Sequence, residues 1–290
     1  MENPAEVKRA QLSAYIQQEL SGEKAVRGVV AIGSVGAGTA GLGSDIDAFV
    51  FLDPLDLYAL PAEFQWRQSE GSYHGIFVDV HDAIQFDFKR VSLQEWSRNG
   101  FDWPEPVRLE LSLGWIAYDI DGQVASLIKR KTAYIDDVRQ GRIDSAILRL
   151  DQLLGNGRVE EAWSRHGAAA AHDRLNDAYD QLLSGVFAYN RQWRPWRSRE
   201  QSHIAQLGWL PSLLRERPAD LVVPVTSSQD GYYERARRLG VCFITLIEQC
   251  QKDGLYGADP ISEAFERCYD EPGRDWNIAE WVARHKSRVM

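Results

Sequence analysis

Asp45 and Asp47, two aspartates separated by one residue, are the side chains of this sequence that most directly suggest chemistry. They introduce an apolar run over 48–52, which is typical of a buried strand. Alternate residues of a strand point to the same face, so we expect both carboxylates to project together. Two like charges that close repel each other unless a cation lies between them. Mg²⁺ is commonly held by one or two carboxylates and phosphate oxygens, so the pair predicts a magnesium site.

The stretch before these aspartates is rich in glycine and predicts a phosphate-binding loop. It begins with Gly33 and Ser34, directly after the apolar run 29–32, and holds five glycines between positions 33 and 43. Glycine lets backbone N–H groups approach a ligand closely, and successive N–H groups form a concave site for anions. We therefore assign Gly33, Ser34 and Ser44 to phosphate binding, beside the metal site.

The whole pattern resembles a known family. Gly33-Ser34 followed by Asp45-x-Asp47 at the start of an apolar strand is similar to the signature of the nucleotidyltransferase (DNA polymerase β-like) superfamily. It most resembles the small bacterial branch of aminoglycoside and lincosamide nucleotidyltransferases, closely over about residues 25–90 and loosely beyond. The resemblance implies transfer of a nucleoside monophosphate, AMP from ATP, to a hydroxyl of a small molecule, with release of pyrophosphate. It further implies Mg²⁺ as cofactor, with an aminoglycoside-like antibiotic as a candidate acceptor.

The family uses a third carboxylate on a later strand, and Asp87 fits this position. Its run, 84–88, alternates apolar and polar residues, which places Asp87 on the polar face. Asp79, in a possible strand over 75–82, is the alternative. We prefer Asp87 because its run alternates more cleanly and its separation from Asp47 resembles the family's. Asp87 would complete the metal site or take the proton of the acceptor, and the sequence leaves these two roles open.

Two other interpretations of the glycine-rich stretch compete with this one. Residues 36–41 match the G-x-G-x-x-G of dinucleotide-binding folds, but that motif requires a helix next, and an apolar β-type run follows here. The second interpretation is a simple hairpin with surface aspartates. Its five glycines would make the folding of such a hairpin entropically costly. A catalytically inactive relative of the family also stays open, because a fold does not guarantee an activity.

The chain is long enough for two domains, and its hydrophobic period changes near residue 122. Short apolar runs before that point indicate strands, whereas apolar residues recur at helical spacing from 123 onward. We therefore predict an α+β protein. A catalytic domain over 1–122, with a mixed nucleotidyltransferase-type sheet and flanking helices, would precede an all-α domain over 123–290. Helical C-terminal domains are usual in the branch that the sequence resembles.

The charge of the chain is unevenly distributed, and this distribution indicates which substrates the protein could bind. The formal net charge is −9; residues 1–125 carry 19 acidic and 9 basic side chains (−10), and the remainder carry 23 and 24 (+1). An acidic catalytic half suits a metal and a cationic acceptor, whereas a nucleic-acid substrate calls for a basic face. We expect ATP and a small hydroxylated acceptor as partners. Toxin-type relatives, which modify a protein hydroxyl or a tRNA end, are the alternative. The oligomeric state stays open.

A basic segment over 189–199 could take part in nucleotide binding. Four arginines and two tryptophans surround a proline there. Arginine binds phosphate oxygens with two parallel hydrogen bonds, and an indole can stack on a base. If the segment faces the catalytic domain, Arg191 and Arg194 are expected to contact the triphosphate. A solvated loop with tryptophans packed on the core is the alternative.

Composition also bears on the cellular location. No apolar stretch approaches the roughly 20 residues of a membrane span, and the first residues lack the basic and apolar regions of a signal peptide. The three cysteines, Cys242, Cys250 and Cys268, fit neither a disulfide framework nor zinc-site spacing. We expect no membrane association and a soluble, cytoplasmic protein, with Cys242 and Cys250 as buried thiols on one helix.

Overall fold

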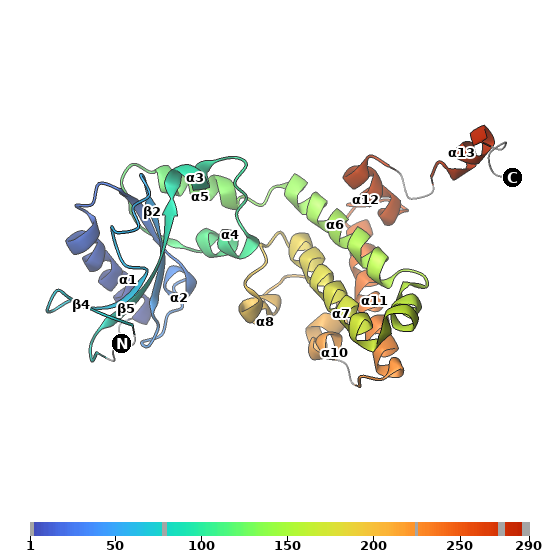
Figure 1. Cartoon of the computed structure of the whole chain (residues 1–290), viewed down its shortest axis with the longest axis horizontal. Helices are drawn as coiled ribbons and strands as arrows, with labels where there is room; N and C mark the ends of the chain where they lie inside the picture. The colour runs from blue at the N-terminus through green and yellow to red at the C-terminus, as the bar shows by residue number, and fades with distance from the viewer. Residues whose placement is uncertain (1–2, 77–79, 224–225, 272–275, 286–290) are drawn as a thin grey trace. The chain divides into compact units, whose positions relative to one another are not determined.

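A computed structural model of the chain describes residues 3–76, 80–223, 226–271 and 276–285. The described residues divide into two compact units, the first within Met1–Ala133 and the second within Tyr134–Met290. The first unit contains a six-stranded sheet with helices on both faces, and the second contains helices (Figure 1). The predicted α+β class, a mixed sheet followed by an all-helical region, is confirmed.

The sheet has the strand order β4-β3-β5-β2-β1-β6. Its strands are β1 (Val26–Ala31), β2 (Ile46–Leu52), β3 (Glu63–Arg67), β4 (Ser72–His74), β5 (Ile84–Ser92) and β6 (Trp115–Asp119). Strands β2 and β5 are parallel, and every other pair in the described sheet is antiparallel. Because β1 and β2 are antiparallel neighbours, the glycine-rich loop between them is not the crossover of a dinucleotide-binding fold, which joins parallel strands.

Helices cover the two faces of the sheet through separate hydrophobic clusters. On one face lies α1 (Pro4–Tyr15), continued by a π-helical turn at Ile16–Leu20; its apolar side packs on alternate residues of β2, β3 and β5. On the other face lie α3 (Leu93–Ser97), α4 (Glu105–Ser112) and α5 (Gln123–Thr132). Helix α1 therefore forms one outer layer of the unit (Figure 1).

The structure divides the chain later than the sequence suggests. The change of hydrophobic period at residue 122 marks the start of α5, but this helix belongs to the first unit. Val124, Leu127 and Ile128 are buried in the same cluster as Phe49 and Phe51 of β2, so the helix completes the core beside the sheet. The assignment of catalysis to the first unit stays a prediction.

The second unit is built around three long helices, α6 (Asp136–Leu154), α7 (Arg158–Tyr189) and α11 (Gln229–Lys252). Their apolar stripes meet in one large cluster, as the helical spacing predicts, and Cys242 and Cys250 are fully buried in it. The shorter elements are η2 (Arg197–Arg199), α8 (Glu200–Ile204), α9 (Ser212–Glu216), α10 (Ala219–Val222), α12 (Pro260–Tyr269) and α13 (Ile278–His285). None of the described helices is both long enough and apolar enough to span a membrane.

A buried carboxylate joins α6 to α12 in this unit. Asp144 is 1% exposed and accepts a hydrogen bond from the hydroxyl of Tyr256. Arg267 of α12 donates to both of its oxygens, each at 2.9 Å, and lies over the ring of Tyr256, 4.8 Å from its centroid. Gln140 adds a fourth donor at 3.1 Å. Both oxygens of the buried carboxylate are thus satisfied, as an interior charge requires.

Candidate active site

The register of the sheet brings two of the predicted aspartates together. Asp47 of β2 pairs directly with Asp87 of the parallel strand β5. Side chains of residues that pair in this way point to the same face of a sheet, and neighbouring strands lie about 4.8 Å apart. The residues on either side, Ile46 and Phe86 among them, are buried against α1, whereas the two aspartates are half-buried. The structure therefore places two carboxylates side by side, on the face opposite α1.

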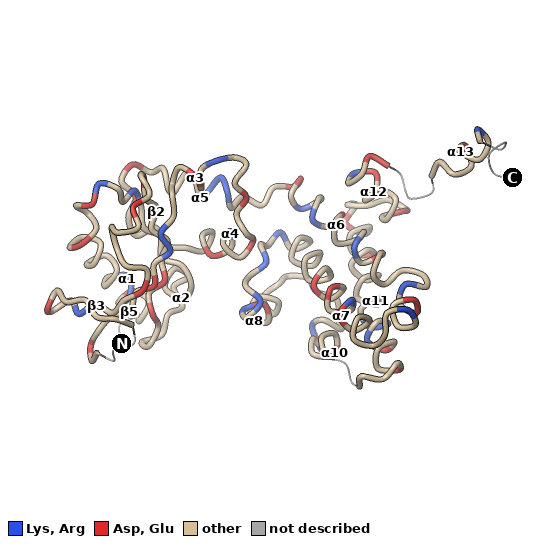
Figure 2. Tube along the Cα trace, viewed as in Figure 1, with Lys and Arg blue, Asp and Glu red and all other residues tan. Residues whose placement is uncertain are grey.

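A third acidic residue, which sequence reasoning missed, lies beside this pair. Glu63 of β3 pairs with Asp87 across an antiparallel ladder and is exposed. Asp47, Asp87 and Glu63 thus form a row across three adjacent strands. The short strand that carries Glu63 has no strong sequence signal, so only the pairing of β3 with β5 reveals it. Figure 2 shows acidic positions on the strands near the β5 label, and the one-turn helix α2 (Gly33–Gly36) contacts the neighbouring strands β1 and β2.

The glycine-serine segment forms the one-turn helix α2 directly after β1. Gly36 packs against the end of β1: a Cβ there would lie 2.4 Å from the carbonyl oxygen of Ala31. No larger residue fits without moving this backbone, which explains the glycine. The loop then returns the chain to β2, and the backbone N–H of Ile32 donates to the carbonyl of Asp47 at 2.9 Å. The turn at Gly33 and Ser34 is therefore tied to the strand that carries Asp47.

Arg9 of α1 holds α2 in place. Its guanidinium donates to the carbonyl oxygens of Val35 at 3.2 Å and Gly36 at 2.8 Å, and stacks over Trp115 at 5.3 Å. The last carbonyls of a helix carry partial negative charge, so a cation at this end is favourable. Arg9 is a positioning residue: it fixes the loop without reaching the aspartates itself.

We expect Arg9→Ala to lower the free energy of unfolding by about 2 kcal/mol, because hydrogen bonds from a charged group contribute more than neutral ones. Glu6→Gln is the matched control, since it removes only the exposed 3.0 Å ion pair with Arg9. That change should cost less than about 1 kcal/mol. Thermal unfolding of both variants compares them. Equal losses would contradict the role of Arg9 in holding α2.

The other predicted residues of the loop differ in their surroundings. Asp45 is exposed and lies one residue before β2 begins, near Lys8 of α1. Burial lowers the pKa of the Lys8 ammonium, and the Asp45 carboxylate opposes this shift. The hydroxyl of Ser44 accepts a hydrogen bond from the backbone N–H of Gly41 at 3.0 Å and so closes the loop. Ser34 makes no side-chain hydrogen bond within the described part of the chain.

Residues 11–100, which include β1 to β5, the glycine-serine turn and all three predicted aspartates, match the family model of the nucleotidyltransferase domain. The N-terminal unit contains a nucleotidyltransferase domain. In structure, the chain is similar to a nucleotidyltransferase-like protein from Exiguobacterium sibiricum 255-15, at 14% sequence identity and a TM-score of 0.43. The match covers 98% of this chain and 85% of that one. In sequence, no curated protein matches the chain.

Within the described residues of the nucleotidyltransferase domain and the helical unit, no three His, Cys, Asp or Glu side chains are grouped so as to hold a metal ion. Asp79, the alternative third carboxylate, lies outside the described residues. Convergence of Asp45, Asp47 and Asp87 on one ion stays a prediction. The pair that the register establishes is Asp47 with Asp87.

A lysine, Lys89, lies on the same strand as Asp87 in the nucleotidyltransferase domain. Lys89 follows Asp87 by two residues on β5, so both side chains project from one face. Its ammonium lies 3.9 Å from the carboxylate of Glu110 on α4 and 5.3 Å from the ring centroid of Phe49. Half of the Lys89 side chain is exposed, and sequence reasoning did not single it out.

The two arginines that the sequence assigns to the triphosphate make ion pairs within the helical unit. Arg191 pairs with Asp136 at the start of α6. Arg194 is largely buried and pairs with Asp180 at 2.7 Å and Glu200 at 2.5 Å. These contacts tie the segment after α7 to α7 itself and to α8. A contact of Arg191 or Arg194 with a nucleotide stays a prediction.

Proposed function

We propose that this protein transfers AMP from ATP to a hydroxyl of a small molecule and releases pyrophosphate. A nucleotidyltransferase domain supports transfer of a nucleoside monophosphate in general. The observation that carries the proposal is the in-register pair of Asp47 and Asp87 beside the glycine-serine turn. The choice of ATP and of a small acceptor rests on the resemblance and on the acidic N-terminal half.

The donor set at this pair suits a magnesium ion. Both side chains are carboxylates, the hard oxygen ligands that Mg²⁺ takes, and Mg²⁺ usually shares one or two of them with substrate phosphates. We propose that Asp45 and Asp47 hold Mg²⁺, and that Asp87 either completes the metal site or serves as the base. A bound Mg²⁺ ion would neutralise the charge that develops on the phosphate oxygens during transfer.

The remaining steps fall to this chain's own residues. The backbone of the turn at Gly33 and the hydroxyls of Ser34 and Ser44 would position the phosphates. The hydroxyl oxygen of the acceptor would attack the α-phosphorus, and the bond from that phosphorus to the bridging oxygen of the pyrophosphate would break. Asp87 would ligate the metal or accept the hydroxyl proton. We place this activity in the cytoplasm.

The test is a transfer assay with the whole chain. The protein is incubated with Mg²⁺ and each of ATP, GTP, CTP and UTP against aminoglycosides, lincosamides, tRNA and cell lysate protein. Mass spectrometry then detects nucleotide adducts, and a coupled assay measures pyrophosphate. An AMP adduct on a small hydroxylated compound, absent when EDTA is added, is the expected result.

Two outcomes of this assay would contradict the proposal in different ways. Adducts found on tRNA or protein alone would replace the small acceptor with a macromolecule while leaving the transfer chemistry intact. Absence of adduct and of pyrophosphate with every nucleotide and acceptor class would instead favour an inactive, nucleotide-binding relative.

A further inference from the structure

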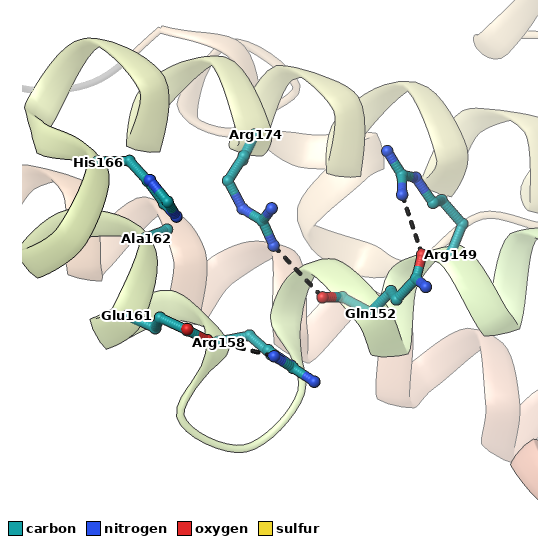
Figure 3. A pocket seen from close by; sticks show the side chains of 7 residues that line it. All are labelled: Arg149, Gln152, Arg158, Glu161, Ala162, His166 and Arg174. Atoms are coloured by element: carbon teal, nitrogen blue, oxygen red, sulfur yellow. Dashed lines mark hydrogen bonds and ion pairs between the residues drawn. The ribbon is translucent and has the colours of Figure 1, made fainter. Parts of the chain in front are cut away.

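The helical unit contains a cavity of about 350 Å³ that is lined mainly by basic side chains. It lies between the end of α6 and the first half of α7 (Figure 3). Its lining consists of Arg149, Gln152, Arg158, Glu161, Ala162, His166 and Arg174. Every one of these residues lies in the second unit, outside the nucleotidyltransferase domain.

A sharp bend in α7 shapes this cavity. Gly167 has φ 79° and ψ 170° within the helix, so the segment before it departs from the axis of the segment after it. A positive φ of this kind favours glycine, since other side chains are strained there. The first segment supplies Arg158 and His166, and the second supplies Arg174. The bend therefore brings two stretches of α7 to one cavity, and α6 provides its third wall.

Arg174 is the least satisfied cation in this arrangement. Its Nη2 atom donates to the backbone oxygen of Gln152 at 3.4 Å, a long hydrogen bond, and its buried Nε has no partner (Figure 3). Among the residues that the structure describes, no carboxylate pairs with Arg174. A buried donor without an acceptor is costly, and such groups in native proteins call for an explanation.

The charges around the cavity do not balance. Glu161 pairs with both Arg158 at 3.2 Å and Arg165 at 2.7 Å, so one carboxylate serves two arginines. Arg149 donates to the side chain of Gln152 at 2.9 Å and reaches Asp177 only at 3.7 Å. Like charges held close together repel each other. An anion bound among Arg149, Arg158 and Arg174 would relieve this repulsion and supply the missing acceptor.

We propose that this cavity is a binding site for the phosphate group of a small molecule. A phosphate monoester carries nearly two negative charges and three acceptor oxygens, which suits guanidinium groups that come from three separate segments. Arginine forks bind such oxygens with paired hydrogen bonds. The cavity volume falls in the range of small-ligand pockets, so it can take a phosphorylated compound of modest size.

Isothermal titration calorimetry of the full chain tests this site with four probes: inorganic phosphate, inorganic pyrophosphate, AMP and succinate. EDTA is present throughout, so that metal-dependent binding at the aspartates does not contribute. We expect pyrophosphate and AMP to bind, and succinate, a carboxylate of similar charge, to bind at least about tenfold more weakly than pyrophosphate. Tighter binding of AMP than of inorganic phosphate would identify a phosphate ester as the ligand, and the reverse would identify a free phosphate.

Arg174→Gln is expected to weaken pyrophosphate binding at least about tenfold, since it removes a charged hydrogen-bond donor. Arg237→Gln is the matched control. Arg237 makes an ion pair with Glu234, as Arg158 does with Glu161, but lies on α11 outside the cavity lining, so its loss should change the Kd less than about twofold. Arg158→Gln, at a half-exposed position, provides a second test should Arg174→Gln fail to fold.

The proposal is overturned if the wild-type chain binds none of the phosphate probes at millimolar concentration. It is equally overturned if Arg174→Gln and Arg158→Gln both fold and bind pyrophosphate as the wild type does. Asp47→Asn should leave this metal-free binding unchanged, because the aspartate belongs to the other unit. Tighter binding in Asp47→Asn, which removes a negative charge that repels the anion, would assign the pyrophosphate to the nucleotidyltransferase domain instead.

Discussion

Replacing Asp47 by asparagine should lower kcat for nucleotide transfer at least about 1,000-fold, measured with the acceptor that the transfer assay identifies. The amide keeps the shape of the side chain but loses its charge, and metal-assisted charge stabilisation is worth several kcal/mol in the transition state. Each 1.36 kcal/mol lost changes the rate about tenfold. Because Asp47 is half-buried, the variant should remain folded, which circular dichroism can verify.

Asp53→Asn is the control for this experiment. Asp53 is exposed and follows the other end of β2, so the same change of charge occurs away from Asp87. We expect its kcat to stay within about twofold of the wild type, since exposed surface changes rarely have larger effects. A second measurement, the Kd for ATP with and without Mg²⁺, separates the roles. Asp47→Asn should abolish the metal-dependent part of ATP affinity. If the variant keeps both its activity and the effect of Mg²⁺ on the Kd for ATP, Asp47 is not a metal ligand.

The same two measurements on Asp87→Asn decide whether Asp87 is a metal ligand or the base for the acceptor hydroxyl, which the sequence leaves open. A metal ligand should show its loss in the metal dependence of ATP binding. A base for the acceptor hydroxyl should instead leave that binding intact and change the pH dependence of kcat. The direct pairing of Asp87 with Asp47 makes either role sterically feasible, since both side chains leave the sheet on one face.

The parts of the site that the sequence predicts are those with a strong local pattern. Asp87 lies in a run whose alternation fixes which face its side chain takes, whereas Asp47 opens a continuous apolar run that predicts only the strand; their shared face follows once the two strands pair. The pairing itself is a property of the sheet. Glu63 comes next to Asp87 only because β3 lies between β4 and β5, and nothing near Glu63 in sequence signals this.

Arg9 illustrates a second kind of omission. In sequence it is one charge on the polar side of an amphipathic helix, where most arginines are solvated. Its contact with Val35 and Gly36 arises because α1 packs across the sheet close to the end of β1. Strand β6, at the edge of the sheet, has no clear sequence signal either, because its buried and exposed residues do not alternate strictly. Sequence periodicity predicts elements well and the contacts between distant elements poorly.

Loss of the buried carboxylate in the helical unit should have the largest effect on stability. We expect Asp144→Ala to lower the free energy of unfolding by about 3 kcal/mol, because it removes the charged acceptor of four hydrogen bonds. Arg267 would lose both of its bonds to the carboxylate, and Tyr256 would lose its acceptor. Thermal unfolding of the full chain measures the change. The control is Asp177→Ala, whose carboxylate is exposed and pairs with Arg149 at 3.7 Å; this change should cost less than about 1 kcal/mol.

A double-mutant cycle distinguishes the network from simple loss of packing. Burial and the hydrogen bond to Asp144 raise the pKa of Tyr256, so its hydroxyl stays protonated and able to donate at neutral pH. Tyr256→Phe removes this donor while keeping the ring on which Arg267 lies. If the hydroxyl and the carboxylate stabilise each other, Tyr256→Phe should cost about 1 kcal/mol less in the Asp144→Ala background than in the wild type. Equal costs in both backgrounds would mean that Arg267 and Gln140 satisfy Asp144 without the hydroxyl, and that the tyrosine contributes through its ring.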